Sequence, residues 1–264
     1  SGPSYTANDC SVADVDGDGE YEIVVKWYPS NQIDSASANL TSPTIFDCYK
    51  LDGTALWRIN LGYNITSGAH FSQFMFYDFD QDGKAEFIVK TADGTKVFAP
   101  DENGQLPTYE EEKAGKGLIG VVGDPTQDGT YMAYTGNTAM EAAIAAGEIS
   151  RSKTGHTWGG PEYLTAFDGL TGAIIDTTDY DCAVGNTSSW GDNNYNRADR
   201  FCAAVAYLPS PSNAQQAVPA AVMQRGYYKR TVIAAYFLID GKLEKIWRIS
   251  TDDNELVYAR GVHT

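Results

Sequence analysis

The chain carries one acidic pattern twice, as Asp14-Val15-Asp16-Gly17-Asp18-Gly19-Glu20-Tyr21-Glu22 and as Asp78-Phe79-Asp80-Gln81-Asp82-Gly83-Lys84-Ala85-Glu86. Side chains at every second position of a tight loop converge on one point, and a final glutamate can complete a shell of oxygen ligands around calcium. Asp and Gly also cluster in ordinary β-turns, but two copies with one spacing argue against chance. With a backbone carbonyl at the fifth position, the predicted calcium ligands are Asp14, Asp16, Asp18, Glu20 and Glu22 in the first loop, and Asp78, Asp80, Asp82, Lys84 and Glu86 in the second.

Short apolar runs flank both acidic loops. Residues 11–13 and 22–25 enclose the first loop, and residues 74–77 and 87–89 enclose the second. Runs rich in β-branched and aromatic residues, divided by a polar turn, are typical of hairpin strands rather than of a helix, loop and helix. The sequence therefore predicts calcium loops of the β type.

The composition favours one compact all-β domain over residues 1–264. The chain has 264 residues, 26 of them glycine, and little helical patterning. Its formal net charge of −16 argues against a nucleic-acid partner, and it has no apolar run of about 18 residues that could span a membrane. Calcium is most plentiful outside the cell, so we expect a secreted, extracellular protein.

A four-stranded unit recurs along the chain. Its inner hairpin surrounds the acidic loop, and its outer hairpin turns at residues 51–54, 168–172 or 240–242. Such tandem units are typical of β-propeller blades. We expect a partial β-propeller with blades at about 8–62, 69–180 and 199–249, and an insertion at about 97–160 that carries a short helix near 138–146.

The last residues repeat the opening of the second unit. Gly68-Ala69-His70 precedes the second acidic loop, and Gly261-Val262-His263 follows the third unit. A fourth blade is therefore expected, because a closed propeller needs about 4 to 8 blades to hide its sheet edges. The sequence predicts about three blades of a longer propeller, whose remaining blades would be its partner.

Basic residues stand at equivalent positions in the three units. Lys26 and Lys90 each lie four residues after the last glutamate of their loop, and Arg225 ends the corresponding strand of the third unit. One cation per blade, at the end away from calcium, would attract an anionic ligand, although strand-end cations are often merely solvated. The starts of the inner strands add Asn8, His70 and the Arg197/Arg200 pair. The predicted substrate-binding residues are Asn8, Lys26, Tyr28, His70, Lys90 and Arg225.

Several long strings resemble one family of enzymes. They are Val25-Lys26-Trp27, Gly68-Ala69-His70-Phe71-Ser72-Gln73-Phe74-Met75, Lys90-Thr91-Ala92-Asp93-Gly94-Thr95-Lys96, Gly160-Pro161-Glu162-Tyr163-Leu164-Thr165, Asn196-Arg197-Ala198-Asp199-Arg200-Phe201 and Arg225-Gly226-Tyr227-Tyr228. In this order they look like bacterial rhamnogalacturonan lyases with an eight-bladed β-propeller. The resemblance covers nearly the whole chain outside residues 97–160.

The resemblance implies calcium-dependent cleavage of the rhamnogalacturonan I backbone of pectin by β-elimination. A base removes the C5 proton of galacturonate while a cation neutralises its carboxylate. The resemblance also implies a sugar contact at Asn8, whereas Tyr28 stands where the family has an aspartate. The family's catalytic Arg, Lys and Tyr belong to later blades, so no catalytic residue is assigned and the chain is expected to be part of the enzyme.

Two other functions fit the acidic loops. An integrin-like calcium-binding propeller that binds glycan or protein without catalysis explains the loops equally well, but it does not explain the long shared strings. A purely structural repeat module is favoured if the strand-end cations point outward. Elimination creates an unsaturated product that absorbs ultraviolet light, which separates the lyase from both alternatives.

Overall fold

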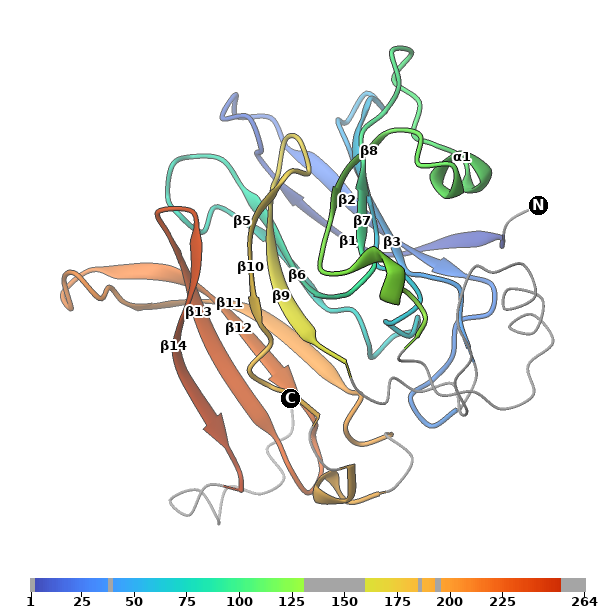
Figure 1. Ribbon diagram of the computed structural model, residues 1–264. Coiled ribbons are helices and arrows are strands. Elements are labelled where there is room, and N and C mark those ends of the chain that lie inside the picture. The colour runs from blue at the N-terminus through green and yellow to red at the C-terminus, as the bar shows by residue number, and fades with distance from the viewer. Residues whose placement is uncertain (1–2, 38–39, 131–159, 185–186, 193–195, 253–264) are drawn as a thin grey trace.

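The computed structural model describes residues 3–37, 40–130, 160–184, 187–192 and 196–252. It is an all-β structure, in which three antiparallel sheets stand beside one another (Figure 1). Helix α1 (Tyr109–Lys113) is the one α-helix among the described residues. No helix in this part of the chain is long and apolar enough to cross a membrane.

The first sheet has six strands in the order β1-β2-β3-β4-β7-β8. Its strand bounds are β1 (Tyr5–Ala13), β2 (Glu22–Pro29), β3 (Ile45–Tyr49), β4 (Ala55–Asn60), β7 (Lys96–Phe98) and β8 (Leu118–Val121). Strand β2 alternates between buried and half-buried residues, as expected of a strand with one face in the core. The first acidic loop connects β1 and β2 as a hairpin, with Val12 opposite Ile23.

The second and third sheets have four strands each. The second sheet runs β10 (Ile174–Asp179), β9 (Glu162–Asp168), β6 (Glu86–Ala92), β5 (Phe74–Tyr77), and the third runs β11 (Phe201–Pro209), β12 (Ala217–Arg225), β13 (Val232–Ile239), β14 (Lys242–Ser250). The second acidic loop connects β5 and β6. In the third sheet Asp240 and Gly241 both have positive φ, which a two-residue hairpin turn requires.

Apolar side chains fill the space between neighbouring sheets. One core cluster includes Val24 and Phe46 of the first sheet and Phe87 of the second, and another includes Ile88 of the second sheet and Met223 of the third. Every residue of β6 is buried, because this strand lies between the two clusters. The second sheet is therefore the middle layer.

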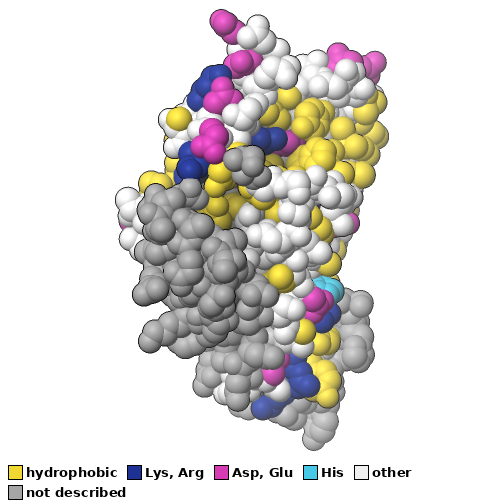
Figure 2. Space-filling model, turned by 90° about the vertical axis from the view of Figure 1, so that its right-hand side faces the viewer, with side chains coloured by type: hydrophobic (Ala, Val, Ile, Leu, Met, Phe, Trp, Pro, Cys, Tyr) yellow, Lys and Arg dark blue, Asp and Glu magenta, His cyan; other side chains and the backbone are white. Residues whose placement is uncertain are grey.

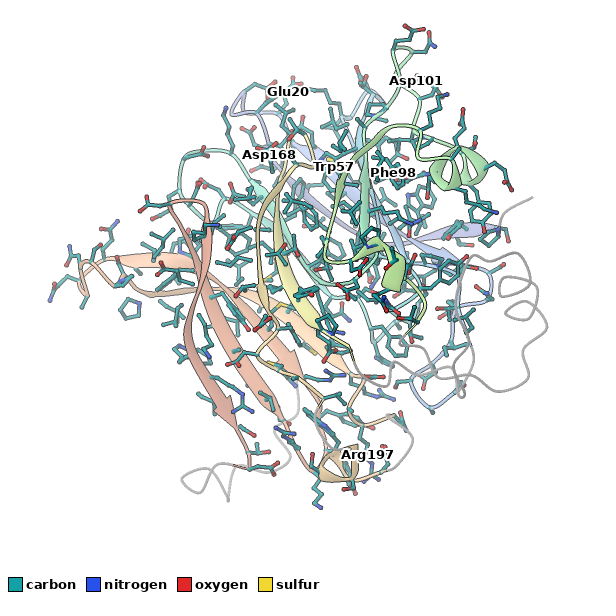
Figure 3. The ribbon with its side chains drawn as sticks, viewed as in Figure 1. Glu20, Trp57, Phe98, Asp101, Asp168 and Arg197 are labelled. Carbon is teal, nitrogen blue, oxygen red and sulfur yellow. The ribbon has the colours of Figure 1, made fainter. Side chains whose placement is uncertain are left out.

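The indole of Trp57 locks the outer hairpins of the first two sheets together. Its side chain is fully buried, and its Nε1 donates to the Gly169 carbonyl at 2.7 Å. A Cβ added to Gly172 would lie 2.8 Å from Trp57, so this turn needs a glycine for close packing. Figure 3 shows Trp57 beside Asp168.

Part of the expected insertion joins the first sheet. Strand β7 pairs with β4, and β8 pairs with β7, while α1 lies over the same side of the molecule (Figure 1). A second short turn, the 3-10 helix η1 (Pro125–Gln127), follows β8. The helix predicted near 138–146 falls outside the described residues.

Strands β1, β5 and β11, each at one edge of its sheet, lie side by side and define two ends of the molecule. Strand β5 contacts both β1 and β11, and the backbone N–H of Phe201 donates to the His70 carbonyl at 3.0 Å where β5 and β11 begin. Figure 3 places Glu20 of the first acidic loop and Arg197 at opposite ends.

Candidate functional site

The first acidic loop is shaped by hydrogen bonds from its own backbone. Asp14 accepts from the N–H groups of Gly17 at 2.7 Å and Gly19 at 2.8 Å. The N–H of buried Val15 donates to Glu22 Oε2 at 3.1 Å. The bond from Gly19 is the main reason why the pKa of Asp14 lies below its ordinary value.

The second acidic loop repeats these bonds. Asp78 accepts from the N–H of Gly83 at 3.0 Å, and the N–H of buried Phe79 donates to Glu86 Oε2 at 2.8 Å. The two loops touch, because the Ala85 N–H donates to the backbone carbonyl of Asp14 at 2.8 Å. The repeated sequence thus folds into two equivalent loops at one end of the molecule.

Each loop gathers carboxylates that could hold a cation, with one oxygen from every member within 4.8 Å of the others. The clusters are Asp78, Asp80, Asp82 and Glu86 in the second loop, and Asp14, Asp16 and Asp18 in the first. Asp78 Oδ1 is buried and has no hydrogen-bond donor among the described residues. A buried oxygen without a partner inside an all-oxygen cluster fits a hard cation such as calcium.

The loops differ in how their charge is balanced. Lys50 Nζ lies 2.9 Å from Asp16 Oδ2 and 3.8 Å from Glu22 Oε1, and this contact lowers the pKa of Asp16. The second cluster has no such ammonium group among the described residues. Burial there raises the pKa of Glu86 to about 8, and the charges of the neighbouring carboxylates, including Asp80, add to the rise. Glu22, a predicted ligand of the first loop, is not a member of the first cluster and lies 3.8 Å from Lys50 Nζ. The carbonyl ligands proposed at the fifth positions stay a prediction.

At the opposite end, two of the three predicted strand-end cations meet around one carboxylate. Lys90 Nζ lies 2.7 Å from Glu162 Oε1, and Arg225 contacts the same carboxylate at 2.7 Å. Arg225 also contacts Asp199 at 2.8 Å. Burial would raise the pKa of Glu162, but Arg225 and Lys90 outweigh it and lower that pKa to about 2. Both cations are buried and already paired, so they do not stand free at an open mouth.

The third cation, Lys26, lies apart from this group. Its side chain is fully buried, and its Nζ lies 3.6 Å from Asp9 Oδ2 without a hydrogen-bond partner among the described residues. The ammonium stands 5.0 Å from the ring centroid of Tyr28, whose hydroxyl also lacks a partner there. Burial lowers the pKa of Lys26 to about 8 and raises that of Tyr28.

Two predicted residues reach solvent at this end. Asn8 is exposed on β1, and the His70 side chain is 33% exposed just before β5. His70 Nε2 lies 3.2 Å from Arg200 NH1 and 3.3 Å from Asp34 Oδ2. Figure 2 shows acidic and basic side chains beside the histidine, drawn in cyan.

Glu162 and Asp34 were missed by the sequence analysis. Glu162 lies in the string Gly160-Pro161-Glu162-Tyr163. The residues of that string do not indicate that the Glu162 carboxylate pairs with Lys90 and Arg225. The partners are 72 and 63 residues away along the chain. The pairing of β6 with β9 within the second sheet brings Lys90 to Glu162, and the packing of the third sheet on the second brings Arg225. Asp34 occupies a loop with no motif.

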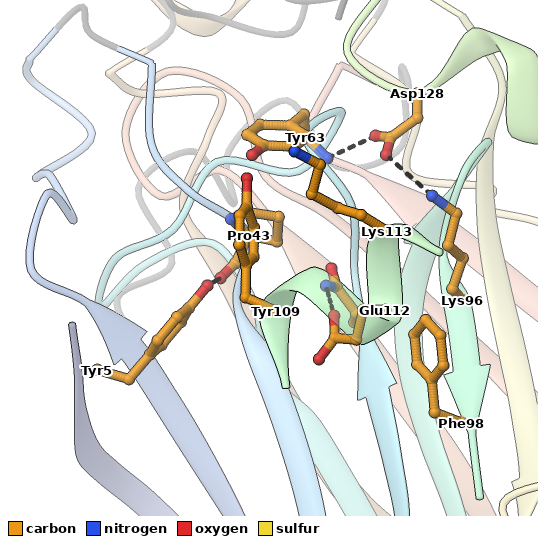
Figure 4. A pocket seen from close by; sticks show the side chains of 10 residues that line it. Tyr5, Pro43, Tyr63, Lys96, Phe98, Tyr109, Glu112, Lys113 and Asp128 are labelled. Carbon is orange, nitrogen blue, oxygen red and sulfur yellow. Dashed lines mark hydrogen bonds and ion pairs between the residues drawn. The ribbon is translucent and has the colours of Figure 1, made fainter. Parts of the chain in front are cut away.

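A separate cavity of about 320 Å³ opens between the first sheet and α1 (Figure 4). Its lining is aromatic and charged, and includes Tyr5, Tyr63, Phe98, Tyr109 and Glu112. Both carboxylate oxygens of Glu112 are already bonded, Oε1 to Arg58 at 3.0 Å and Oε2 to Asn60 at 2.7 Å. The carboxylate of Glu112 therefore stabilises the cavity wall through these two hydrogen bonds.

The chain belongs to the rhamnogalacturonan lyase family 11, because the model of that family's C-terminal domain matches residues 2–111 and 104–264. It is 43% identical over 262 residues to the rhamnogalacturonan endolyase YesW of Bacillus subtilis (strain 168), covering 98% of this chain and 35% of that protein. It is 42% identical over 263 residues to the rhamnogalacturonan exolyase YesX of the same organism, covering 99% and 36%.

The fold agrees with this relationship. The rhamnogalacturonan lyase PL11 of Bacillus licheniformis superposes with a TM-score of 0.75 at 43% identity, over 98% of this chain and 36% of that chain. The structure of the exotype lyase YesX gives a TM-score of 0.74. The chain thus spans 35–36% of the length of the relatives it matches.

Proposed function

We propose that this chain is part of a polysaccharide lyase that cleaves the rhamnogalacturonan I backbone of pectin by β-elimination at galacturonate. The observation that carries the proposal is an identity of 42–43% over 98–99% of the chain to an endolyase and an exolyase that act on rhamnogalacturonan. The acidic substrate would bind at the end of the molecule where cations gather, away from the acidic loops.

We propose that the three sheets are blades of a β-propeller, at about 8–62, 69–180 and 199–249, with the insertion at about 97–160. Three features support this arrangement: the sheets are antiparallel, each neighbouring pair shares an apolar core, and β5 contacts both β1 and β11. The inner strands of a propeller line its central channel. The ends of those strands away from the acidic loops would then form the mouth where substrate binds.

Calcium is the proposed cofactor, held by the two acidic loops. Bound there, it would neutralise carboxylates and stabilise the hairpin turns. The buried, unpartnered Asp78 Oδ1 and the raised pKa of Glu86 support a cation in the second loop. A calcium-loaded protein would act where calcium is plentiful, so the proposed location is extracellular.

The chain's own residues would bind and orient the galacturonate. Elimination needs the carboxylate to be neutralised, because the C5 proton is otherwise too weakly acidic for a protein base. Asn8 is exposed on β1, and His70 is partly exposed just before β5. Lys26 is buried between Asp9 of β1 and the Tyr28 ring, and Lys90 and Arg225 support the site through Glu162.

Mass analysis of the products tests the reaction. The chain is incubated with rhamnogalacturonan I and calcium, with a chelator control. Elimination gives one unsaturated fragment that is lighter by one water than a hydrolytic product. Because the resemblance assigns the catalytic Arg, Lys and Tyr to later blades, we expect such fragments in calcium from the protein that includes those blades, and binding of the polymer without cleavage by this chain alone. An intact polymer beside the protein that includes those blades would instead favour the non-catalytic calcium-binding propeller.

A further inference from the structure

The cations at the proposed binding end differ in how completely they are neutralised. Arg225 and Lys90 are buried against Glu162, within 2.7 Å of it. Arg200 has its closest described carboxylate, Asp34, at 3.9 Å, which is too long for a hydrogen bond. The Asp34 side chain is also 52% exposed, so water screens its charge. The charge of Arg200 is therefore less completely neutralised than those of Arg225 and Lys90.

The guanidinium of Arg200 is held in one orientation. Its NH1 lies 3.2 Å from His70 Nε2, and its central carbon lies 4.7 Å from the ring centroid of Tyr227. Burial, and after it the charge of Arg200, lower the pKa of His70. At neutral pH the imidazole is therefore uncharged, and its Nε2 can accept a hydrogen bond from Arg200. Because Arg200 is already ordered, binding a ligand costs less conformational entropy than it would with a mobile arginine.

The Arg200 group has donors left for a ligand. Its Nε is buried and has no acceptor among the described residues, and NH2 has no carboxylate within hydrogen-bond length there. The Arg200 side chain keeps 29% of its surface exposed. NH2 can therefore donate to a carboxylate, an anion that suits a planar guanidinium, whereas the enclosed Nε is not reached by a ligand in this conformation.

A cavity of about 240 Å³ lies directly beside this guanidinium. Its lining residues are His70, Arg200, Phe201, Cys202, Gln224, Gly226 and Tyr227. Sites for drug-sized ligands measure about 300–1,000 Å³, so this cavity suits a single sugar unit. Its walls are tied by backbone hydrogen bonds, from Phe201 to His70 at 3.0 Å and from Gly226 to Arg200 at 2.8 Å.

We propose that Arg200 binds the carboxylate of one galacturonate unit, which sits in this cavity against Tyr227. The inference deepens the proposed function and rests on it, because it names the group of the substrate that this end recognises. The ion pairs of Lys90 and Arg225 with Glu162 then stabilise the neighbouring part of the protein. The contact of His70 with Arg200 positions the guanidinium.

Calorimetric titration with a galacturonate-rhamnose disaccharide tests the assignment, alongside the same disaccharide with its carboxyl group reduced to an alcohol. The variants are Arg200→Gln, Arg200→Lys and the control Arg248→Gln. Arg248 lies on β14, outside the proposed site, and its Nε donates to the Asp181 carbonyl at 3.0 Å. Melting curves establish that each variant is folded.

We expect Arg200→Gln to weaken the binding of the acidic disaccharide about tenfold or more, as for a lost charged hydrogen bond. Arg200→Lys should restore part of that loss, and Arg248→Gln should leave binding unchanged. The reduced disaccharide should bind the native chain as weakly as the acidic one binds Arg200→Gln. Equal binding of both disaccharides to the native chain would overturn the assignment to a carboxylate, even if no arginine variant folds.

The outcomes separate this inference from the proposed function. If the native chain binds and cleaves rhamnogalacturonan while Arg200→Gln binds as tightly as the native chain, the role of Arg200 is refuted and the lyase proposal stands. If the native, calcium-loaded chain binds neither the disaccharide nor the polymer, the proposed function fails and the role of Arg200 fails with it.

Discussion

The side chain of Lys26, on β2, is fully buried and carries an ammonium charge. Its pKa is about 8 in the folded chain against an ordinary 10.5. Between these pH values the unfolded chain binds more protons than the folded chain, so the free energy of unfolding rises with pH through this window. Below about pH 8 the full cost of burying the ammonium remains.

Lys26→Met removes this pH dependence. We expect the native chain to gain stability relative to the variant between pH 8 and 10.5, by up to about 3 kcal/mol at about 1.4 kcal/mol per pKa unit. Urea unfolding at both ends of the window measures the change. Lys242→Met, at an exposed lysine, is the control. A difference between native chain and Lys26→Met that stays constant with pH would contradict the burial argument.

The residues of the proposed binding end show which features could be predicted from the sequence and which could not. The spacing from the second acidic loop locates Lys90 near a strand end, and the alignment of the repeated units does the same for Arg225, because strand periodicity is local. It does not locate Glu162, whose contacts join two sheets, nor the distance between Arg200 and Asp34. Side-chain pairing across sheets depends on the tertiary packing, and one sequence without that packing cannot supply it.

At the scale of elements, the two acidic hairpins could be predicted from their repeated spacing, and both are present as β1-β2 and β5-β6. The turn at Asp240-Gly241 was likewise visible, since few residue pairs accept two positive φ angles. Helix α1 was not predicted, because five residues are too few for a helical period and its stability comes from contacts with the first sheet.

Lys50 makes the two acidic hairpins unequal. Its ammonium lies 2.9 Å from Asp16, in the position of a competing cation. Lys50→Met should therefore strengthen calcium binding by the first loop about tenfold, as expected from removing one charge about 4 Å from a divalent ion. Calcium calorimetry on the variant measures this change, with Lys242→Met as the control. Unaltered calcium affinity in Lys50→Met would show that the ammonium does not compete.

The outer hairpins of the first two sheets depend on Trp57. Because its side chain is fully buried, Trp57→Ala should lower the free energy of unfolding by about 3–5 kcal/mol. Trp57→Phe keeps most of the volume and loses the bond to Gly169, so it should cost less. Urea unfolding of both variants compares the two effects. A loss below about 1 kcal/mol in Trp57→Ala would mean that the sheets do not need this contact.

For the whole molecule, calcium should couple both acidic loops to global stability. The loops touch each other, and the residue after each first aspartate is buried in a core. A ligand that binds only the folded state raises the melting temperature by mass action. We expect a chelator to lower the melting temperature of the calcium-loaded chain and added calcium to restore it. A melting curve that excess chelator leaves unchanged would refute the stabilising role.

Substrate is proposed to bind at the end of the inner strands, far from the acidic loops. Residue-resolved NMR of the calcium-loaded chain, titrated with the galacturonate-rhamnose disaccharide, tests this location most directly. We predict that the shifting backbone signals gather at His70, Arg200, Gln224 and Tyr227 and spare both acidic loops. Shifts confined to the cavity beside α1, at Tyr5, Tyr63 and Tyr109, or no shifts at any ligand concentration, would contradict the account.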